Sequence, residues 1–262
     1  MKTIDIQNAS VIFGTKTVLD RISWSVEKGE RYFILGANGA GKTTLVKLLL
    51  GYLWPRFGAT IRILGEEYGK INLPELRKRI AWVSPFVHQY TQNPNLTACE
   101  LVLSGRDATL GTYFQDISEE EEQKAREMLE MLNAGHLLHE KVRVLSSGEQ
   151  VKVLIARALM TDPELMILDE PNVYLDVPGR EFLLRTIREL AETRPELTLV
   201  FITQRIEDIL PQFTHGMILK EGRIMADGLR EEVLTEENLK LAFGMDLQLI
   251  QTRSGRFWTV IE

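Results

Sequence analysis

A glycine-rich segment with one lysine offers the clearest chemistry in this sequence. It fits the pattern G-x-x-x-x-G-K-[ST], in which glycines let successive backbone N–H groups turn inward around phosphate oxygens. Lys42 adds a positive charge for the β- and γ-phosphates, and the hydroxyl of Thr43 can bind Mg²⁺. The motif predicts a nucleotide site made by Gly36, Ala37, Asn38, Gly39, Ala40, Gly41, Lys42, Thr43 and Thr44.

Two adjacent carboxylates form a second group. Asp169 and Glu170 follow the apolar run 165–168, which is typical of a buried strand. A carboxylate at the C-terminal end of a strand lies where open α/β sheets bind ligands. We expect Asp169 to hold Mg²⁺, which prefers oxygen ligands and keeps part of its water shell. We expect Glu170 to orient or deprotonate an attacking water.

A short serine–glycine segment, LSSGE at 145–149, opens a helical pattern that runs from 148 to 159. The hydroxyl of Ser146 and the N–H groups around Gly148 would form an anion site at the start of that helix. Taken alone, the segment indicates only a helix cap. Its meaning therefore depends on the other motifs of the chain.

In this order and spacing, the phosphate loop, LSSGE and LDEP (168–171) resemble the ATP-binding-cassette (ABC) family over residues 3–228. The resemblance implies that ATP drives two copies of the chain into a head-to-tail homodimer with shared sites. The γ-phosphate bound to one copy would then meet Ser146, Ser147, Gly148 and Glu149 of the other. It also implies that Phe13 stacks on adenine, with an aromatic of the strand core as the nearly equal alternative. Asp176 would belong to a loop linking the two sites.

The resemblance extends to less specific segments. GYLWP (51–55), RIAWVS (79–84), LVLSG (101–105) and FTHGMILKEGRI (213–224) are similar to ABC ATPases of the YlmA and molybdate-linked ModF type, and a metal-chelate importer subunit is the nearby alternative. Such a chain would hydrolyse ATP to drive a transmembrane permease. It would then be cytoplasmic and peripheral to the cell membrane, and its one cysteine fits a reducing compartment.

Three positions depart from the family pattern. Gln204 stands where a histidine usually contacts the γ-phosphate, and because an amide cannot shuttle a proton we expect slow turnover. For the glutamine that usually binds Mg²⁺, Gln89 is the candidate, and a plain loop residue is the equal alternative. Glu149 replaces a usual glutamine, and we expect its charge to face away from phosphate.

Two functions therefore stay open. The first is an ATPase subunit, which Lys42, Asp169 and Glu170 favour; the second is a nucleotide-gated regulatory module with little turnover, which Gln204 favours. A nucleic-acid partner is disfavoured, because 31 basic against 37 acidic residues give a net charge of −6.

The elements that must position these residues alternate between strand and helix patterns. Strands are predicted within 1–35 and at 81–83, 165–168 and 198–203, and helices at 42–50, 117–133, 148–159 and 179–193. This alternation predicts an α/β fold with a largely parallel sheet. With the resemblance, the expected fold is a P-loop NTPase (RecA-like) core with an N-terminal antiparallel β subdomain and an inserted α-helical signature subdomain at about 97–159. The ATP-binding domain would span 1–228. The segment 229–262 would form a tail with one amphipathic helix at 234–243 and an end in which apolar and polar residues alternate.

Overall fold

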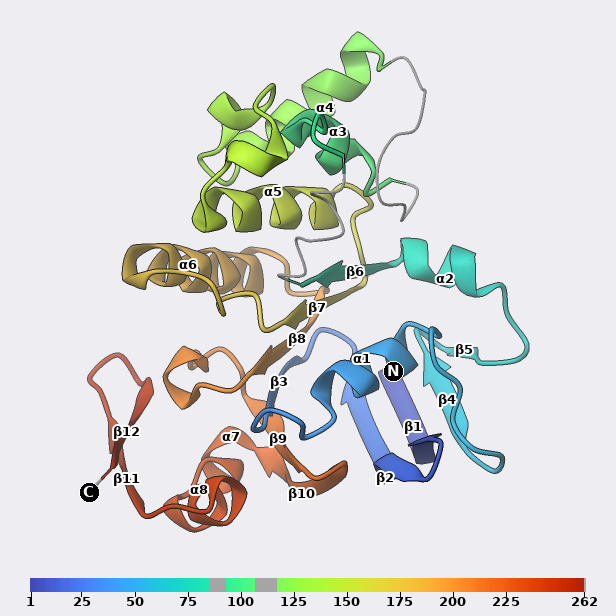
Figure 1. The fold of residues 1–262 in the computed structure, drawn as a ribbon, viewed down its shortest axis with the longest axis vertical. Helices are drawn as coiled ribbons and strands as arrows, with labels where there is room; N and C mark the ends of the chain where they lie inside the picture. Colours follow the sequence, from blue (N-terminus) through green and yellow to red (C-terminus); the bar gives the residue numbers. More distant parts are fainter. Residues whose placement is uncertain (85–92, 107–116, 262) are drawn as a thin grey trace. The chain divides into compact units, whose positions relative to one another are not determined.

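The computed structural model describes residues 1–84, 93–106 and 117–261 (Figure 1). These residues divide into two compact units. Unit 1 combines Met1–Leu73 with Ala191–Glu262, and unit 2 is Pro74–Leu190. The N-terminal strands and the C-terminal tail therefore belong to one unit although they are far apart in the sequence.

Unit 1 contains an antiparallel sheet with the strand order β2–β1–β4–β5. Alternating apolar residues place Ile4 and Ile6 of β1 and Trp24 and Val26 of β2 in the core, as expected of a sheet with one solvated face. Its strands are β1 (Lys2–Phe13), β2 (Lys16–Glu27), β4 (Thr60–Ile63) and β5 (Glu66–Glu67).

Four further strands of unit 1 follow the order β10–β9–β3–β8. β3 pairs in parallel with both β8 and β9, whereas β9 and β10 form an antiparallel hairpin. The core here contains three fully buried aromatic residues: Phe33 of β3, Phe201 of β8, and Phe213, which precedes β9. The ring centroids of Phe201 and Phe213 lie 5.4 Å apart. The bounds are β3 (Arg31–Leu35), β8 (Thr198–Thr203), β9 (His215–Lys220) and β10 (Arg223–Leu229), and α1 (Lys42–Leu49) follows β3.

The C-terminal tail packs within unit 1. The predicted amphipathic helix is confirmed as α8 (Glu236–Phe243), preceded by the short α7 (Arg230–Val233), and α7 and α8 both contact β9 and β10. The apolar-alternating end forms a hairpin of β11 (Leu247–Gln251) and β12 (Phe257–Ile261). This hairpin contacts the one-turn 3₁₀ helix η4 (Ile206–Asp208), which follows β8.

Unit 2 holds a parallel strand pair and most of the helices. β6 (Ile80–Val83) pairs with β7 (Leu165–Asp169), and the three helices α3 (Ala98–Leu103), α4 (Glu119–Glu130) and α5 (Ser147–Leu159) pack against one another. The acidic first turn of α4 suits the positive end of its helix dipole. The remaining elements are α2 (Leu73–Lys78), η2 (Gly135–Leu137), η3 (Val142–Val144) and α6 (Val177–Thr193). The first residue of α2 and the last three of α6 belong to unit 1.

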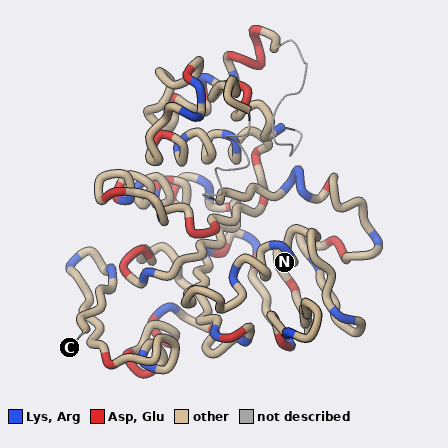
Figure 2. Tube along the Cα trace, in the orientation of Figure 1, with Lys and Arg blue, Asp and Glu red and all other residues tan. Residues whose placement is uncertain are grey.

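The predicted α/β fold class is confirmed: the chain combines an antiparallel sheet, parallel strands and helices. Acidic and basic residues are interspersed along the whole described trace (Figure 2). Within residues 1–84, 93–106 and 117–261, no helix combines the length and the apolarity needed to cross a bilayer.

Candidate functional site

The phosphate loop lies in unit 1, between β3 and α1. Gly39 and Gly41 have φ values of 79° and 106°, in the left-handed region that glycine tolerates. A Cβ on Gly41 would lie 2.9 Å from the Leu19 side chain, so this turn also needs the smallest residue. A Cβ on Gly39 would meet nothing within 4 Å. The loop is therefore open at the Cβ position of Gly39.

Lys42 is the first residue of α1, and its ammonium group folds back over the loop. Its Nζ donates to the carbonyl oxygens of Gly36 at 2.6 Å and of Ala37 at 2.9 Å, and the side chain is buried. The ammonium group is thus held inside the loop that would receive phosphate oxygens. Gly41 at the N-cap has no side chain to occupy the first N–H groups of α1, which suits an anion there.

The β9–β10 turn supports the loop from behind. The Gly222 N–H donates to the Ala40 carbonyl, and the Asp20 N–H donates to the Gly222 carbonyl, both at 2.9 Å. Arg223 binds the Asp20 carboxylate through Nε at 2.9 Å and Nη2 at 2.7 Å and so holds the pKa of Asp20 below its usual range. Sequence reasoning missed this support; the signal available was Glu221-Gly222 between two β-prone runs.

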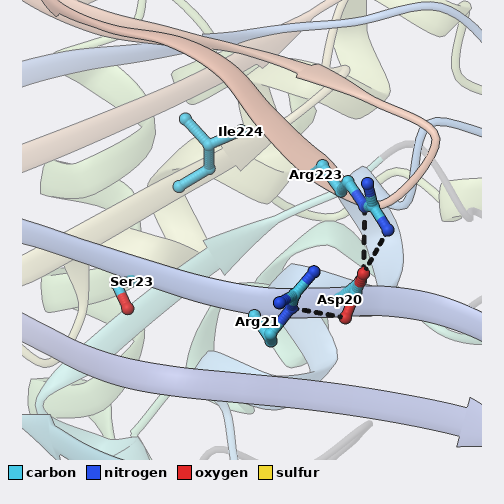
Figure 3. A pocket seen from close by; sticks show the side chains of 5 residues that line it. All are labelled: Asp20, Arg21, Ser23, Arg223 and Ile224. Atoms are coloured by element: carbon cyan, nitrogen blue, oxygen red, sulfur yellow. Dashed lines mark hydrogen bonds and ion pairs between the residues drawn. The ribbon is translucent and has the colours of Figure 1, made fainter.

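Asp20 and Arg223 also line an open pocket of about 340 Å³ beside β2 and β10 (Figure 3). Arg21 and Arg223 both point toward Asp20, and Ser23 and Ile224 complete the lining. Since both guanidinium groups share one carboxylate, the pocket is internally ion-paired. We assign it to the support of the loop.

Gln204 lies next to the start of the phosphate loop. β3 and β8 pair in parallel with Leu35 opposite Thr203, and the Gly36 N–H donates to the Thr203 carbonyl at 3.3 Å. Gly36 therefore follows β3 directly, and the half-buried Gln204 follows β8 directly. The structure brings these two predicted site residues of unit 1 together.

Phe13 ends β1 in unit 1. Its side chain is 51% exposed, so it is not a core residue of the sheet. An exposed aromatic ring at a strand end is able to stack on a planar base. Of the two interpretations left open by the sequence, the structure favours the surface one.

The two acidic residues lie in unit 2, at the end of β7. Asp169 is the last residue of the strand and is buried, whereas Glu170 is half-buried. Glu170 has φ of 50°, which costs a non-glycine residue about 1–3 kcal/mol and is retained mainly where a function requires it. The backbone therefore turns at Glu170, directly after the strand that ends in Asp169.

The serine–glycine segment begins α5 in unit 2, as predicted. Ser146 is the N-cap: its hydroxyl accepts from the Glu149 N–H at 3.4 Å. A Cβ on Gly148 would meet nothing within 4 Å, and Ser146 and Ser147 are exposed. The start of α5 therefore has open space in front of it.

The expectation that the Glu149 charge faces away from phosphate stays a prediction, but its carboxylate has a defined place at the helix start. Its carboxylate does not face away from the helix start: Oε2 accepts from the Ser146 N–H at 2.8 Å and from the Ser146 hydroxyl at 2.7 Å. These bonds close a capping box and hold the pKa of Glu149 below its usual range. The physical reason is that the N-terminal N–H groups of a helix attract the nearest carboxylate.

Two predicted residues remain. Asp176 precedes α6 and accepts a hydrogen bond from the Gly179 N–H at 2.9 Å, so it caps that helix. Gln89 lies outside the described residues. For magnesium, the buried carboxylate of Asp169 and the hydroxyl of Thr43 at the start of α1 are both oxygen donors of the kind that the ion prefers.

Comparison with known proteins identifies the family. The family model of the ABC transporter matches residues 19–173. The uncharacterized ABC transporter ATP-binding protein YlmA of Bacillus subtilis (strain 168) is 38% identical over 260 residues, which cover 99% of this chain and 97% of YlmA.

Two solved structures agree. One, described as a metal-chelate type ABC transporter in an inward-facing conformation, has a TM-score of 0.80 and 26% identity over 100% of this chain and 97% of that chain. The other is a dimeric post-hydrolysis state of the cassette MJ0796 bound to ADP and Pi, with a TM-score of 0.72 and 25% identity over 86% of this chain and 98% of that one. This chain therefore belongs to the ABC transporter family, as an ATP-binding cassette of the ABC ATPase type.

Proposed function

We propose that the chain binds Mg-ATP and works as a head-to-tail homodimer whose ATP hydrolysis drives a transmembrane permease. Residues 1–228 would form the ATP-binding domain. Binding to the permease would place the chain at the cytoplasmic face of the membrane. One observation carries the proposal: the chain has both a glycine-built phosphate loop and an open helix start. At that helix start, a Cβ added to Gly148 would have nothing within 4 Å. Such a helix start, whose Ser146 donors are held by the Glu149 carboxylate until a phosphate takes them over, fits a phosphate presented by a second chain.

Each residue has a role in this proposal. Lys42 exchanges the carbonyls of Gly36 and Ala37 for phosphate oxygens, and Phe13 stacks on the base. Thr43 and Asp169, with Gln89, would hold Mg²⁺, which neutralises charge on the phosphates. Glu170 orients and deprotonates the attacking water.

The signature segment completes the site from the second chain. Ser146 donates its hydroxyl and N–H to the γ-phosphate, and Asp176 lies in the loop that links the two sites. In the isolated chain these two donors are bound by Glu149. Phosphate therefore has to displace the Glu149 carboxylate before the dimer closes.

The proposal is tested with Glu170→Gln protein. It should bind Mg-ATP, form a stable dimer in gel filtration and release phosphate much more slowly than the natural chain. Equal phosphate release by the two proteins would contradict the role of Glu170. Co-purification of the trapped dimer with an integral membrane protein would support the permease, and recovery of the homodimer alone would argue against it.

A second candidate function is a nucleotide-gated regulatory module with slow turnover. Gln204 favours it, because an amide beside the phosphate loop carries no charge and cannot shuttle a proton. If Gln204 limits turnover, Gln204→His should raise kcat with little change in KM for ATP. An unchanged kcat would show that this position does not limit the reaction.

A further inference from the structure

The turn of the C-terminal hairpin carries an arginine that is buried against the main chain. Arg256 is only 8% exposed, and its guanidinium donates twice to the Glu207 carbonyl, from Nε at 2.9 Å and from Nη2 at 2.7 Å. Burying a charged side chain is costly unless its hydrogen bonds are well placed. A guanidinium with a fixed planar geometry suits such a placement, because little freedom is lost for each bond made.

The hairpin holds Arg256 in a defined position. The Thr252 N–H donates to the Arg256 carbonyl at 2.8 Å, and the Arg256 N–H donates to the Thr252 hydroxyl at 3.2 Å. Arg230, itself 4% exposed, donates to the Gly255 carbonyl and lies 4.6 Å over the Phe257 ring. The turn is thereby fixed to the start of α7, which follows β10 directly.

Glu207 is three residues from Gln204. Between them, the Arg205 N–H donates to the Thr203 hydroxyl at 3.0 Å, and the Asp208 N–H donates to the Arg205 carbonyl at 3.3 Å. Thr203 in turn accepts from the Gly36 N–H of the phosphate loop. One short turn of backbone therefore connects the carbonyl bound by Arg256 with the residue beside the phosphate loop, and all of it lies within unit 1.

We propose that Arg256 is a positioning residue for ATP hydrolysis: it fixes the η4 turn by its Glu207 carbonyl and so sets the backbone from which Gln204 reaches the γ-phosphate. This inference rests on the proposed role of Gln204. A single 3₁₀ turn leaves its last carbonyls without helical partners, so an external donor is needed to hold it. The C-terminal tail is thereby part of the catalytic geometry.

A purely structural staple is the competing explanation, and kinetics can distinguish the two. In the full chain, Arg256→Ala should lower kcat about tenfold while KM for ATP changes little, because a small displacement of a phosphate-contacting group is felt mainly in the transition state. Arg256→Lys keeps the charge and the stem but not the planar fork, so it should give an intermediate kcat. Arg253→Ala is the matched control, since Arg253 is an exposed arginine in the same turn.

The decisive measurement repeats Arg256→Ala in a Gln204→Ala background, with thermal unfolding followed for every variant. If Arg256 acts through Gln204, its replacement has little further effect on kcat there. The same fold-loss of kcat in both backgrounds, or Arg256→Lys and Arg256→Ala rates equal to that of Arg253→Ala, would overturn the inference. Gln204→Ala with unchanged kcat would overturn it too, whereas the ATPase proposal itself fails only if Glu170→Gln hydrolyses ATP as the natural chain does.

Discussion

Glu149→Gln should strengthen the ATP-dependent dimer. In the isolated chain the Glu149 carboxylate accepts two hydrogen bonds from Ser146, at 2.8 and 2.7 Å, and these donors are the ones proposed to meet the γ-phosphate of the second copy. A phosphate oxygen that takes over the donors still faces the displaced negative charge nearby. The amide of glutamine removes that charge and keeps the size of the side chain.

The magnitude follows from the geometry. Two unit charges about 4 Å apart interact by about 1 kcal/mol in a water-like dielectric, which is the appropriate value because Glu149 is half-exposed. A head-to-tail dimer contains two such sites, so its dissociation free energy should rise by about 2 kcal/mol. That corresponds to a dissociation constant about 30-fold lower.

The assay is sedimentation equilibrium with Mg-ATP in a Glu170→Gln background, which keeps the nucleotide intact. The chain provides a matched control at α4, where Glu121 closes a capping box onto Ser118 with the same bonds, at 3.0 and 3.1 Å. Glu121→Gln removes a carboxylate charge from another helix start, where it suits the helix dipole. It should leave the dimer unchanged.

A dimer constant that is unchanged or weaker in the Glu149→Gln protein would refute the proposed competition. An equal gain from Glu121→Gln would also refute it, because the effect would then reflect net charge. A further check is salt: the difference in dimer constant that Glu149→Gln produces should shrink as ionic strength rises, since exposed charges are screened.

Three further predictions concern the loop, the base and the cysteine. Gly36→Ala should destabilise the fold by about 1–3 kcal/mol in chemical denaturation, because a Cβ would lie 2.5 Å from the Leu219 carbonyl oxygen. A Cβ on Gly148 would meet open space, so Gly148→Ala should not lower stability. It should, however, weaken the ATP-dependent dimer. Equal unfolding midpoints for the two alanine variants would contradict this. Phe13→Ala should raise KM for ATP with kcat little changed, because the exposed ring stabilises bound substrate and transition state alike, while Phe13→Trp should retain affinity; a loss of kcat alone would argue against stacking. Burial raises the pKa of Cys99 to about 11, so at pH 8 the folded chain should react with a thiol reagent about 100-fold more slowly than the unfolded chain, and equal rates would contradict the buried position.

Motifs carried by consecutive residues were predictable from the sequence. The strand before the phosphate loop, the helix after it and the helix from 147 to 159 lie within one or two residues of their predicted bounds, because hydrophobic periodicity and local capping determine them. The orientation of Phe13 was not predictable. Register shifts between β1 and β2 near Val11 and Ile12 break the alternation that would otherwise assign a face to each side chain.

Contacts between distant residues were also beyond the sequence. Arg256 and Glu207 are 49 positions apart, and no local pattern indicates that a tail arginine binds the turn after Gln204. The hairpins β9–β10 and β11–β12 were recognised only as a family-like segment and as an alternating tail. Glu149 shows the opposite case, because S-x-x-E is a local capping signal and the correct orientation was available from it.

The two carbonyls bound by Lys42 have a consequence for affinity. The ammonium group is bound by the Gly36 and Ala37 carbonyl oxygens, and in the proposed function it would exchange these for the oxygens of a phosphate. Nucleotide binding is then a replacement of one set of hydrogen bonds by another, and the lysine contributes only the difference between them. A small anion with too little charge to replace the two carbonyls at the Lys42 ammonium would gain little binding free energy. We therefore expect the loop to bind polyphosphates in preference to anions of low charge.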